Sequence, residues 1–149
     1  MNNSQNYVKL EMDARSENVA LARVLVSTFI APFDPTMGEL SDIKTAVSEA
    51  VTNAVIHGYG EAAGIVTMIV TSETVPNGKK IIIKISDSGV GIENIENARE
   101  PLFTTKPEME RSGLGFTVME SFMDSVEITS SPGSGTTVSL TKTLQMQEQ

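Results

Sequence analysis

The stretch that most constrains the fold of this chain runs from Ile43 to Gly58. Its apolar residues recur at spacings of three and four, which predicts an amphipathic helix with one face in a hydrophobic core. Gly58 stands where a glycine that ends a helix is expected. Glu49, Asn53 and His57 follow one another at intervals of four, so they form a polar stripe beside the apolar face.

Asn53 is an unfavourable residue for a helix interior, because its side chain competes for backbone hydrogen bonds. Glu49, one turn earlier, can accept a proton, and the amide oxygen of an asparagine is an acceptable ligand for Mg²⁺. Two interpretations of this stretch remain open. It is either a solvated helix face with an incidental asparagine, or a site that holds a hydroxyl and a hard cation side by side.

The composition excludes several classes of protein. A length of 149 residues fits one domain, 1–149, with a real core. The absence of cysteine excludes a disulfide scaffold and a cysteine-based zinc site. No apolar run is long enough to span a membrane and residues 1–7 are polar, so we expect a cytoplasmic protein without membrane contact. The net charge of −8 argues against direct nucleic-acid binding but permits a basic protein partner.

The order of the predicted elements indicates the fold class. A helix that Ser16 could cap runs to about Phe33, and the capping-box pattern of residues 36–39 starts a second helix. A third helix opens at residues 112–116. Strand-like segments, two pairs of them joined by turn sequences, cover residues 7–12, 65–73, 80–85, 125–130 and 136–143. The sequence therefore predicts an α+β fold, a two-layer sandwich with an antiparallel or mixed sheet and helices on one face.

The first predicted helix has more apolar positions than one core-facing side needs, so part of it is expected to face a partner or a second subunit. Arg23 interrupts the apolar line of Val19, Val26 and Ile30. It fits either an arginine that snorkels at the edge of the core or a residue that contacts a partner.

Two separated Gly-x-Gly elements are candidates for nucleotide binding. Gly89 and Gly91 follow Asp87 at the end of a strand, where a carboxylate could accept a hydrogen bond from an exocyclic amine such as that of adenine. Gly113 and Gly115 stand at a helix start, where free N–H groups favour phosphate. Each element alone is also typical of a plain turn. The loop before the second element carries residues that could close over an anion, namely Thr104, Thr105, Lys106 and Arg111.

Taken together, these elements resemble the boxes of the GHKL ATP-binding superfamily, also called the Bergerat fold. The matching residues, in chain order, are Glu49 to Asn53, Asp87-x-Gly89-x-Gly91, Gly113-x-Gly115 and Gly135-Thr136-Thr137. The stretches 48–59, 101–108 and 111–116 resemble the sporulation anti-sigma F factors of spore-forming bacilli, a family of serine-protein kinases that sequester a sigma factor.

The resemblance implies roles for individual residues. Glu49 would be the general base and Asn53 the Mg²⁺ ligand, while Asp87 would bind the adenine of ATP or ADP with Thr137 near it. The helix-1 residue Arg23 would contact the protein partners, which are RNA polymerase sigma factor F and the anti-anti-sigma factor that is phosphorylated. The nucleotide pocket and its lid would comprise Gly89, Gly91, Thr104, Thr105, Lys106, Arg111, Ser112, Gly113, Leu114, Gly115 and Phe116.

Some alternatives remain open. The one histidine, His57, lies in the nucleotide-binding helix itself, so the phosphoryl acceptor is expected on another protein. The chain could also be the paralogous anti-sigma B kinase of the general stress response, a catalytically silent module that only sequesters a partner, or an ATPase fragment of a larger machine. A homodimer is expected from the apolar faces of the first helix.

Overall fold

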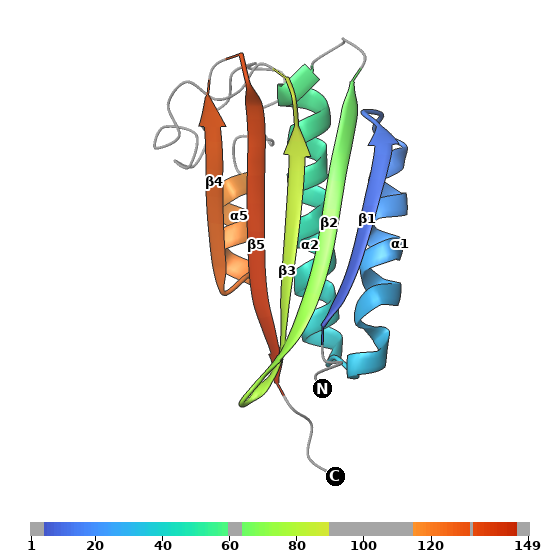
Figure 1. Ribbon diagram of the computed structural model, residues 1–149, viewed down its shortest axis with the longest axis vertical. Coiled ribbons are helices and arrows are strands. Elements are labelled where there is room, and N and C mark those ends of the chain that lie inside the picture. Colours follow the sequence, from blue (N-terminus) through green and yellow to red (C-terminus); the bar gives the residue numbers. More distant parts are fainter. Residues whose placement is uncertain (1–4, 60–63, 90–114, 132, 146–149) are drawn as a thin grey trace.

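Five strands form one antiparallel sheet in the computed structural model, which describes residues 5–59, 64–89, 115–131 and 133–145. The order across the sheet is β1-β2-β3-β5-β4 (Figure 1). The bounds of the strands are β1 Asn6–Asp13, β2 Ile65–Val75, β3 Gly78–Asp87, β4 Ser125–Ser131 and β5 Gly135–Gln145. The predicted strands are thus confirmed, and β3 takes the predicted central place.

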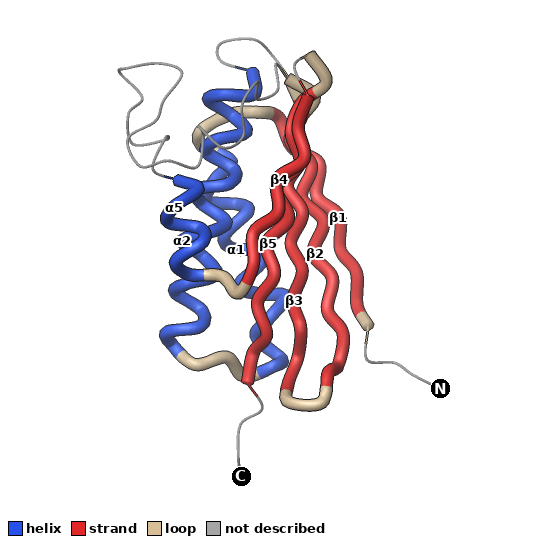
Figure 2. Tube along the Cα trace, turned by 90° about the vertical axis from the view of Figure 1, so that its left-hand side faces the viewer, coloured by secondary structure: helices blue, strands red, loops and turns tan. Residues whose placement is uncertain are grey.

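Three helices cover one face of this sheet, as Figure 2 shows in edge view. They are α1 (Asn18–Ile30), α2 (Met37–Asn53) and α5 (Gly115–Phe122). The predicted α+β sandwich with helices on one face is confirmed. Alternate residues of the strands point into the layer between sheet and helices, because side chains alternate across a strand. The buried apolar residues of β2 and β3 on that side are Val66, Met68, Val70, Ile81, Ile83 and Ile85.

Helix α2 lies against the centre of the sheet and begins with a complete capping box. The Glu39 amide donates to Thr36 Oγ1 over 3.0 Å, and the Thr36 amide donates to Glu39 Oε1 over 2.9 Å. The second carboxylate oxygen of Glu39 accepts from the Gln145 amide at the end of β5. The predicted apolar face is buried in the core through Ile43, Ala46, Val47, Ala50 and Val51.

The structure corrects two predicted helix ends. Ser16 does not cap α1, because Glu17 is the N-cap residue and makes no side-chain cap bond. A backbone turn replaces the cap: the Val19 amide donates to the carbonyl of Ser16. Gly58 does not follow the helix end either, because the chain continues past Asn53 as a π-helical turn, Ala54–Tyr59, which includes it.

Helix α5 is fixed by a lysine that reaches across from β5. Lys142 Nζ donates to the carbonyl of Phe122, the last residue of α5, over 2.8 Å. The same ammonium lies 3.7 Å from a carboxylate oxygen of Asp42 on α2. A cation at a helix C-terminus is favourable because it meets unpaired carbonyl groups there. One half-buried side chain therefore joins β5, α5 and α2.

Helix α1 covers the edge of the helical layer and packs against α2. Its core side consists of Ala22, Val26, Phe29 and Ile30. Leu21 and Val24, by contrast, are 50% and 61% exposed. The sequence-based expectation that α1 carries more apolar surface than its own core uses is therefore correct. None of the helices in the described part of the chain is long and apolar enough to cross a membrane.

Candidate functional site

The candidate site lies where α2, β3 and β5 meet at one end of the molecule. The C-terminal ends of α2 and β3 and the start of β5 all lie at this end (Figure 1). The π-helical turn that follows α2 contacts both β3 and β5. This arrangement brings the segment after Asn53 to the strand end that carries Asp87, although the two residues are 34 positions apart in the sequence.

Asn53 is buried without hydrogen-bond partners. Its side chain is the last of α2, only 7% of the residue is exposed, and neither Nδ2 nor Oδ1 has a partner in the described part of the chain. An unsatisfied buried polar group costs about 1–3 kcal/mol, so such groups are rare in folded proteins. The amide oxygen is a suitable Mg²⁺ ligand and the amide nitrogen can donate to a phosphate or a water. The Asn53 side chain is therefore suited to bind a metal ion together with the phosphates of a nucleotide.

Glu49 lies one turn before Asn53 and is half-buried, at the border between the core face of α2 and its outer face. The two residues share one helix, so their spacing is set by backbone hydrogen bonds rather than by a loop. Partial burial keeps a carboxylate accessible to an incoming hydroxyl group. His57 belongs to the π-helical turn, and its side chain lies outside the described part of the structure.

The π-helical turn begins immediately after Asn53. The Ala54 amide lies within hydrogen-bonding reach of the carbonyls of both Ala50 and Val51, a shared bond that is common at helix ends. π-Helical turns are rare and occur frequently at functional sites. The sequence pattern predicted an uninterrupted helix here, because an apolar spacing of three and four does not distinguish a widened last turn from a regular one.

Asp87 at the end of β3 is held by backbone donors. Its Oδ1 accepts from the Gly89 amide over 2.9 Å, and the Thr136 amide also donates to the carboxylate. Burial raises the pKa of Asp87 above its ordinary value of 3.8, and the two N–H donors oppose part of that rise. A partly desolvated carboxylate with a fixed orientation can accept a hydrogen bond from an exocyclic amine.

Gly135 allows β5 to begin directly beside Asp87. Its φ of +89° is unfavourable for a side chain, and a Cβ there would lie 2.1 Å from the carbonyl oxygen of Asp87. The residue paired with Asp87 across the sheet is Thr136. Thr137 instead pairs with Ser86, and their hydroxyls are 3.0 Å apart. The sequence reasoning named Thr137 near Asp87 and quoted Thr136 only as part of the Gly135-Thr136-Thr137 element. The alternation of strand side chains was the signal that could have separated the two.

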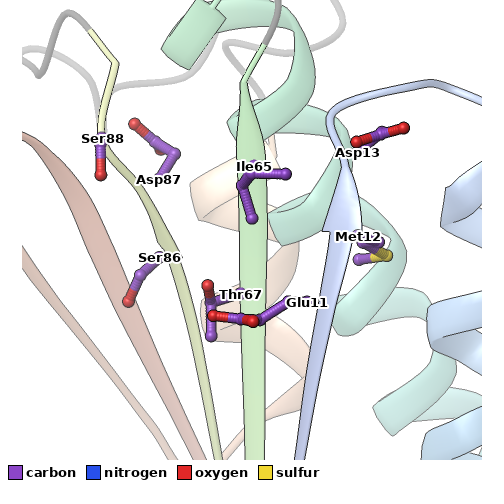
Figure 3. A pocket seen from close by; sticks show the side chains of 8 residues that line it. All are labelled: Glu11, Met12, Asp13, Ile65, Thr67, Ser86, Asp87 and Ser88. Carbon is purple, nitrogen blue, oxygen red and sulfur yellow. The ribbon is translucent and has the colours of Figure 1, made fainter.

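A cavity of about 570 Å³ opens at the same end of the sheet. Figure 3 shows its lining, which comes from the ends of β1, β2 and β3 and comprises Glu11, Met12, Asp13, Ile65, Thr67, Ser86, Asp87 and Ser88. Glu49 and Asn53 do not line it. The cavity shares Asp87 with the candidate site, but Glu11, Thr67 and Ser86 belong to strand positions that face away from the helices. We therefore regard it as a neighbour of the candidate site.

The remaining predicted site residues divide into a first group that the structure describes and a second group that it does not. Gly115 begins α5, and Phe116 is buried in the hydrophobic core at 6% exposure, so the structure shows a packing contact for this side chain. Gly89 is described and donates to Asp87. The second group lies outside the described residues and comprises Gly91, Thr104, Thr105, Lys106, Arg111, Ser112, Gly113 and Leu114.

Arg23 is half-buried on α1 and points toward α2. Its Nη1 donates to Ser48 Oγ over 3.1 Å. This position is compatible with an arginine at the edge of the core, because the residue is half-buried. It is also compatible with a partner contact, because four of its five N–H donors make no hydrogen bond within the described part of the chain. The contact of Arg23 on α2 is Ser48, the residue before Glu49 in the sequence.

The comparison with known families identifies the class of domain. Residues 12–142 match the family described as the histidine kinase-like ATPase domain. The match includes the helix with Glu49 and Asn53, the Asp87 strand end and the Gly135 strand start. The chain therefore belongs to the histidine kinase-like ATPase domains, which implies a nucleotide-binding domain.

Curated relatives narrow the identification. The chain is 57% identical over 141 residues to proteins named anti-sigma F factor from Bacillus velezensis FZB42 and Bacillus subtilis 168, with 94% of each chain covered. It is 55% identical over the same length to the anti-sigma F factor of Bacillus cereus G9842. Within the ATPase-like class, the chain belongs to the anti-sigma F factor family, so the predicted resemblance is confirmed.

Solved structures agree on the fold. A crystal structure of the RsbU and RsbW domains of Rv1364c from Mycobacterium tuberculosis aligns with a TM-score of 0.64 at 19% identity, covering 97% of this chain and 34% of that one. The mycobacterial sensor histidine kinase MprB aligns with a TM-score of 0.54 at 18% identity, covering 94% of this chain and all of that one. At such identities the likeness concerns the fold alone.

Proposed function

We propose that this chain is an anti-sigma factor that is also an ATP-dependent protein-serine kinase. It sequesters sigma factor F and uses MgATP to phosphorylate a serine of an anti-anti-sigma factor, which controls the release of the sigma factor during sporulation. The observation that carries the proposal is the buried, unpaired carboxamide of Asn53 one turn after Glu49, in a chain 55–57% identical to anti-sigma F factors.

The residues divide the work of phosphoryl transfer. Glu49 accepts the proton of the serine hydroxyl while the serine oxygen forms a bond to the γ-phosphorus and the bond from that phosphorus to the ADP oxygen breaks. The carboxamide oxygen of Asn53 would hold Mg²⁺, and the ion would neutralise phosphate charge there. Asp87 accepts a hydrogen bond from the adenine amine. Most of the barrier reduction comes from positioning and charge, so few reactive groups are needed.

The lid residues of the proposal remain predictions. Lys106 and Arg111 would supply positive charge to the phosphates, and Thr104 and Thr105 would donate hydrogen bonds to them. Gly91, Gly113 and Gly115 would allow the backbone to approach the nucleotide, beside Ser112, Leu114 and Phe116.

The surface of α1 supports two further parts of the proposal. We infer that Leu21 and Val24 contact a second copy of the chain, because two exposed aliphatic side chains one helical turn apart give an apolar surface for self-association. We infer that Arg23 contacts the protein partners. Substitution of Arg23 by Glu should abolish partner binding while MgATP affinity stays at the wild-type value.

The test is transfer of labelled γ-phosphate to a purified anti-anti-sigma protein, together with capture of sigma factor F by the immobilised chain. Transfer and capture by the wild type support the proposal. Capture without transfer would leave a silent sequestering module, and capture of the general-stress sigma factor in place of sigma F would identify the paralogous kinase. Light scattering that shows a monomer at tens of micromolar would refute the homodimer.

A further inference from the structure

We propose that Ser48 is a positioning residue for partner recognition, which holds the Arg23 guanidinium against α2. The inference rests on the proposed function, because it concerns the same partner surface and the same helix. It adds a residue to which neither the family resemblance nor the comparisons assign a role.

The hydroxyl of Ser48 makes two hydrogen bonds, which fix the direction of its hydrogen. Ser48 Oγ donates its one hydrogen to the carbonyl of Lys44 over 2.9 Å. It must therefore act as an acceptor toward Arg23 Nη1, which lies 3.1 Å away. Both contacts are half-buried, so water competes less for them than at an open surface. The guanidinium is thus docked on a hydroxyl whose lone pair faces α1.

This docking orders Arg23 without consuming its binding capacity. In the described part of the chain the guanidinium makes this hydrogen bond and no ion pair. One N–H of five is used, so the edge formed by Nε and Nη2 still presents two donors in the geometry that meets a carboxylate side-on. The backbone carbonyl of Arg23 also accepts from Ser27 Oγ, four residues later on α1.

The hydrogen bond from Arg23 to Ser48 orders the arginine side chain before a partner binds. Ser48 directly precedes Glu49 in the sequence of α2, and their side chains leave the helix about 100° apart. A long arginine side chain loses several rotatable bonds when it binds, and pre-ordering it removes part of that cost before the partner arrives. The expected gain from one ordered side chain is about two- to tenfold in partner affinity.

The experiment uses two isosteric substitutions, Ser48→Thr and Ser48→Val, which differ only in the hydroxyl. We expect Ser48→Val to raise the KM for the anti-anti-sigma protein and the Kd for the sigma factor by about two- to tenfold. Ser48→Thr keeps the hydroxyl, so its KM and Kd should equal those of the wild type. Both variants should bind MgATP with the wild-type affinity, measured by calorimetry. In Ser48→Val the KM should rise while kcat stays at the wild-type value.

Ser27→Ala is a matched control, because Ser27 also donates to a carbonyl four residues earlier but does not touch the guanidinium. It should leave partner affinity unchanged. In an Arg23→Ala background, Ser48→Val should have no further effect, because the group it positions is gone. Equal or tighter partner binding by Ser48→Val, or full additivity with Arg23→Ala, would overturn the proposal. If the wild type captures the sigma factor without phosphoryl transfer, the kinase proposal fails, and Ser48 is then judged by the Kd alone.

Discussion

The two ends of helix α2 differ in how their polar groups are satisfied. At the N-terminal end Thr36 and Glu39 bond reciprocally, and Glu39 also accepts from the amide of Gln145. At the C-terminal end the carboxamide of Asn53 is buried and unpaired in the described structure, and the helix widens into a π-helical turn. Both ends belong to one helix in one core, so burial alone does not explain the difference.

The difference separates residues that stabilise the fold from residues that await a ligand. A satisfied helix end contributes to the free energy of unfolding. An unsatisfied buried amide opposes folding, so its retention requires a gain elsewhere, and binding of a nucleotide would supply one. Substitutions at the start of α2 should therefore change stability and leave binding intact, whereas substitutions at its end should do the reverse.

The largest effect is expected for Glu49→Ala, which removes the proposed base. The rate of phosphoryl transfer should fall by about 10²- to 10⁴-fold, a typical contribution of general base catalysis. Nucleotide affinity and partner affinity should stay nearly unchanged, because Glu49 acts on the hydroxyl of the protein substrate. The measurement is single-turnover transfer of labelled phosphate, with affinities determined in parallel.

Glu127→Ala is the control for Glu49→Ala, since Glu127 is an exposed carboxylate on β4. Wild-type transfer by Glu49→Ala would show that Glu49 is not the base. A loss of ATP binding as large as that of an Asn53 variant would show that the two residues do not have separate roles.

Asn53→Ala should have the next largest effect. The loss of a metal ligand and of a phosphate donor should weaken MgATP binding by about 10- to 100-fold. The thermal midpoint of the ligand-free protein should stay the same or rise, because two unpaired buried polar atoms are removed and alanine favours the helix.

Ser72→Ala provides the matched control for Asn53→Ala. Ser72 Oγ is also buried without a partner in the described structure, but it lies on β2, outside the candidate site. This substitution should preserve or raise stability without changing MgATP affinity. A large loss of stability in Asn53→Ala would mean that the carboxamide supports the fold, and the contrast between the two ends of α2 would then disappear.

Thr36→Ala tests the opposite end of α2. Removal of the cap should cost about 0.5–2 kcal/mol of unfolding free energy, which lowers the thermal midpoint by about 2–8 °C in a domain of this size. MgATP affinity should not change. Thr28→Ala is the control, because its hydroxyl bonds only the carbonyl of Val24 on the exposed side of α1. Weakened nucleotide binding in Thr36→Ala would show that the two ends are coupled.

The sequence predicted the layers of the fold well, because their causes are local. The capping box at Thr36, the Pro76–Asn77 turn and the alternation of residues 7–12 in β1 are each visible in a few neighbouring residues. Four short elements were also sufficient to identify the family, since four weak patterns in a fixed order are more specific than each alone. They are the Glu49-to-Asn53 spacing, the Asp87 strand end with Gly89 and Gly91, the Gly113–Gly115 pair, and Gly135-Thr136-Thr137.

The features that the sequence did not predict depend on contacts between distant segments. The bond from Arg23 to Ser48 joins residues 25 positions apart on different helices, and no local pattern indicates it. The choice of Thr136 over Thr137 as the neighbour of Asp87 follows from the register between β3 and β5. The π-helical turn after Asn53 arises where α2 meets those strands, so its cause is also tertiary.

The smallest effect is expected for the stability of Asp87→Asn, and its sign depends on pH. Burial raises the pKa of Asp87 in the folded protein above its ordinary value of 3.8. As the pH rises past that value, the unfolded chain releases the Asp87 proton first and the folded protein retains it longer. The unfolded state therefore binds fewer protons, so the stability of the wild type falls through this window and then reaches a plateau above the raised pKa.

Asn at position 87 does not titrate, so the difference in unfolding free energy between Asp87→Asn and the wild type isolates this one group. We expect the difference to grow in favour of the variant from pH 3.8 upward and to become constant above the raised pKa. Urea unfolding of both proteins between about pH 3.5 and 7 measures it. At neutral pH the variant should bind ATP more weakly, because a carboxamide can present its NH₂ group to the adenine amine. A difference that does not vary with pH would show that burial does not raise the pKa of Asp87, and this strand end would then resemble the satisfied start of α2 rather than its unsatisfied end.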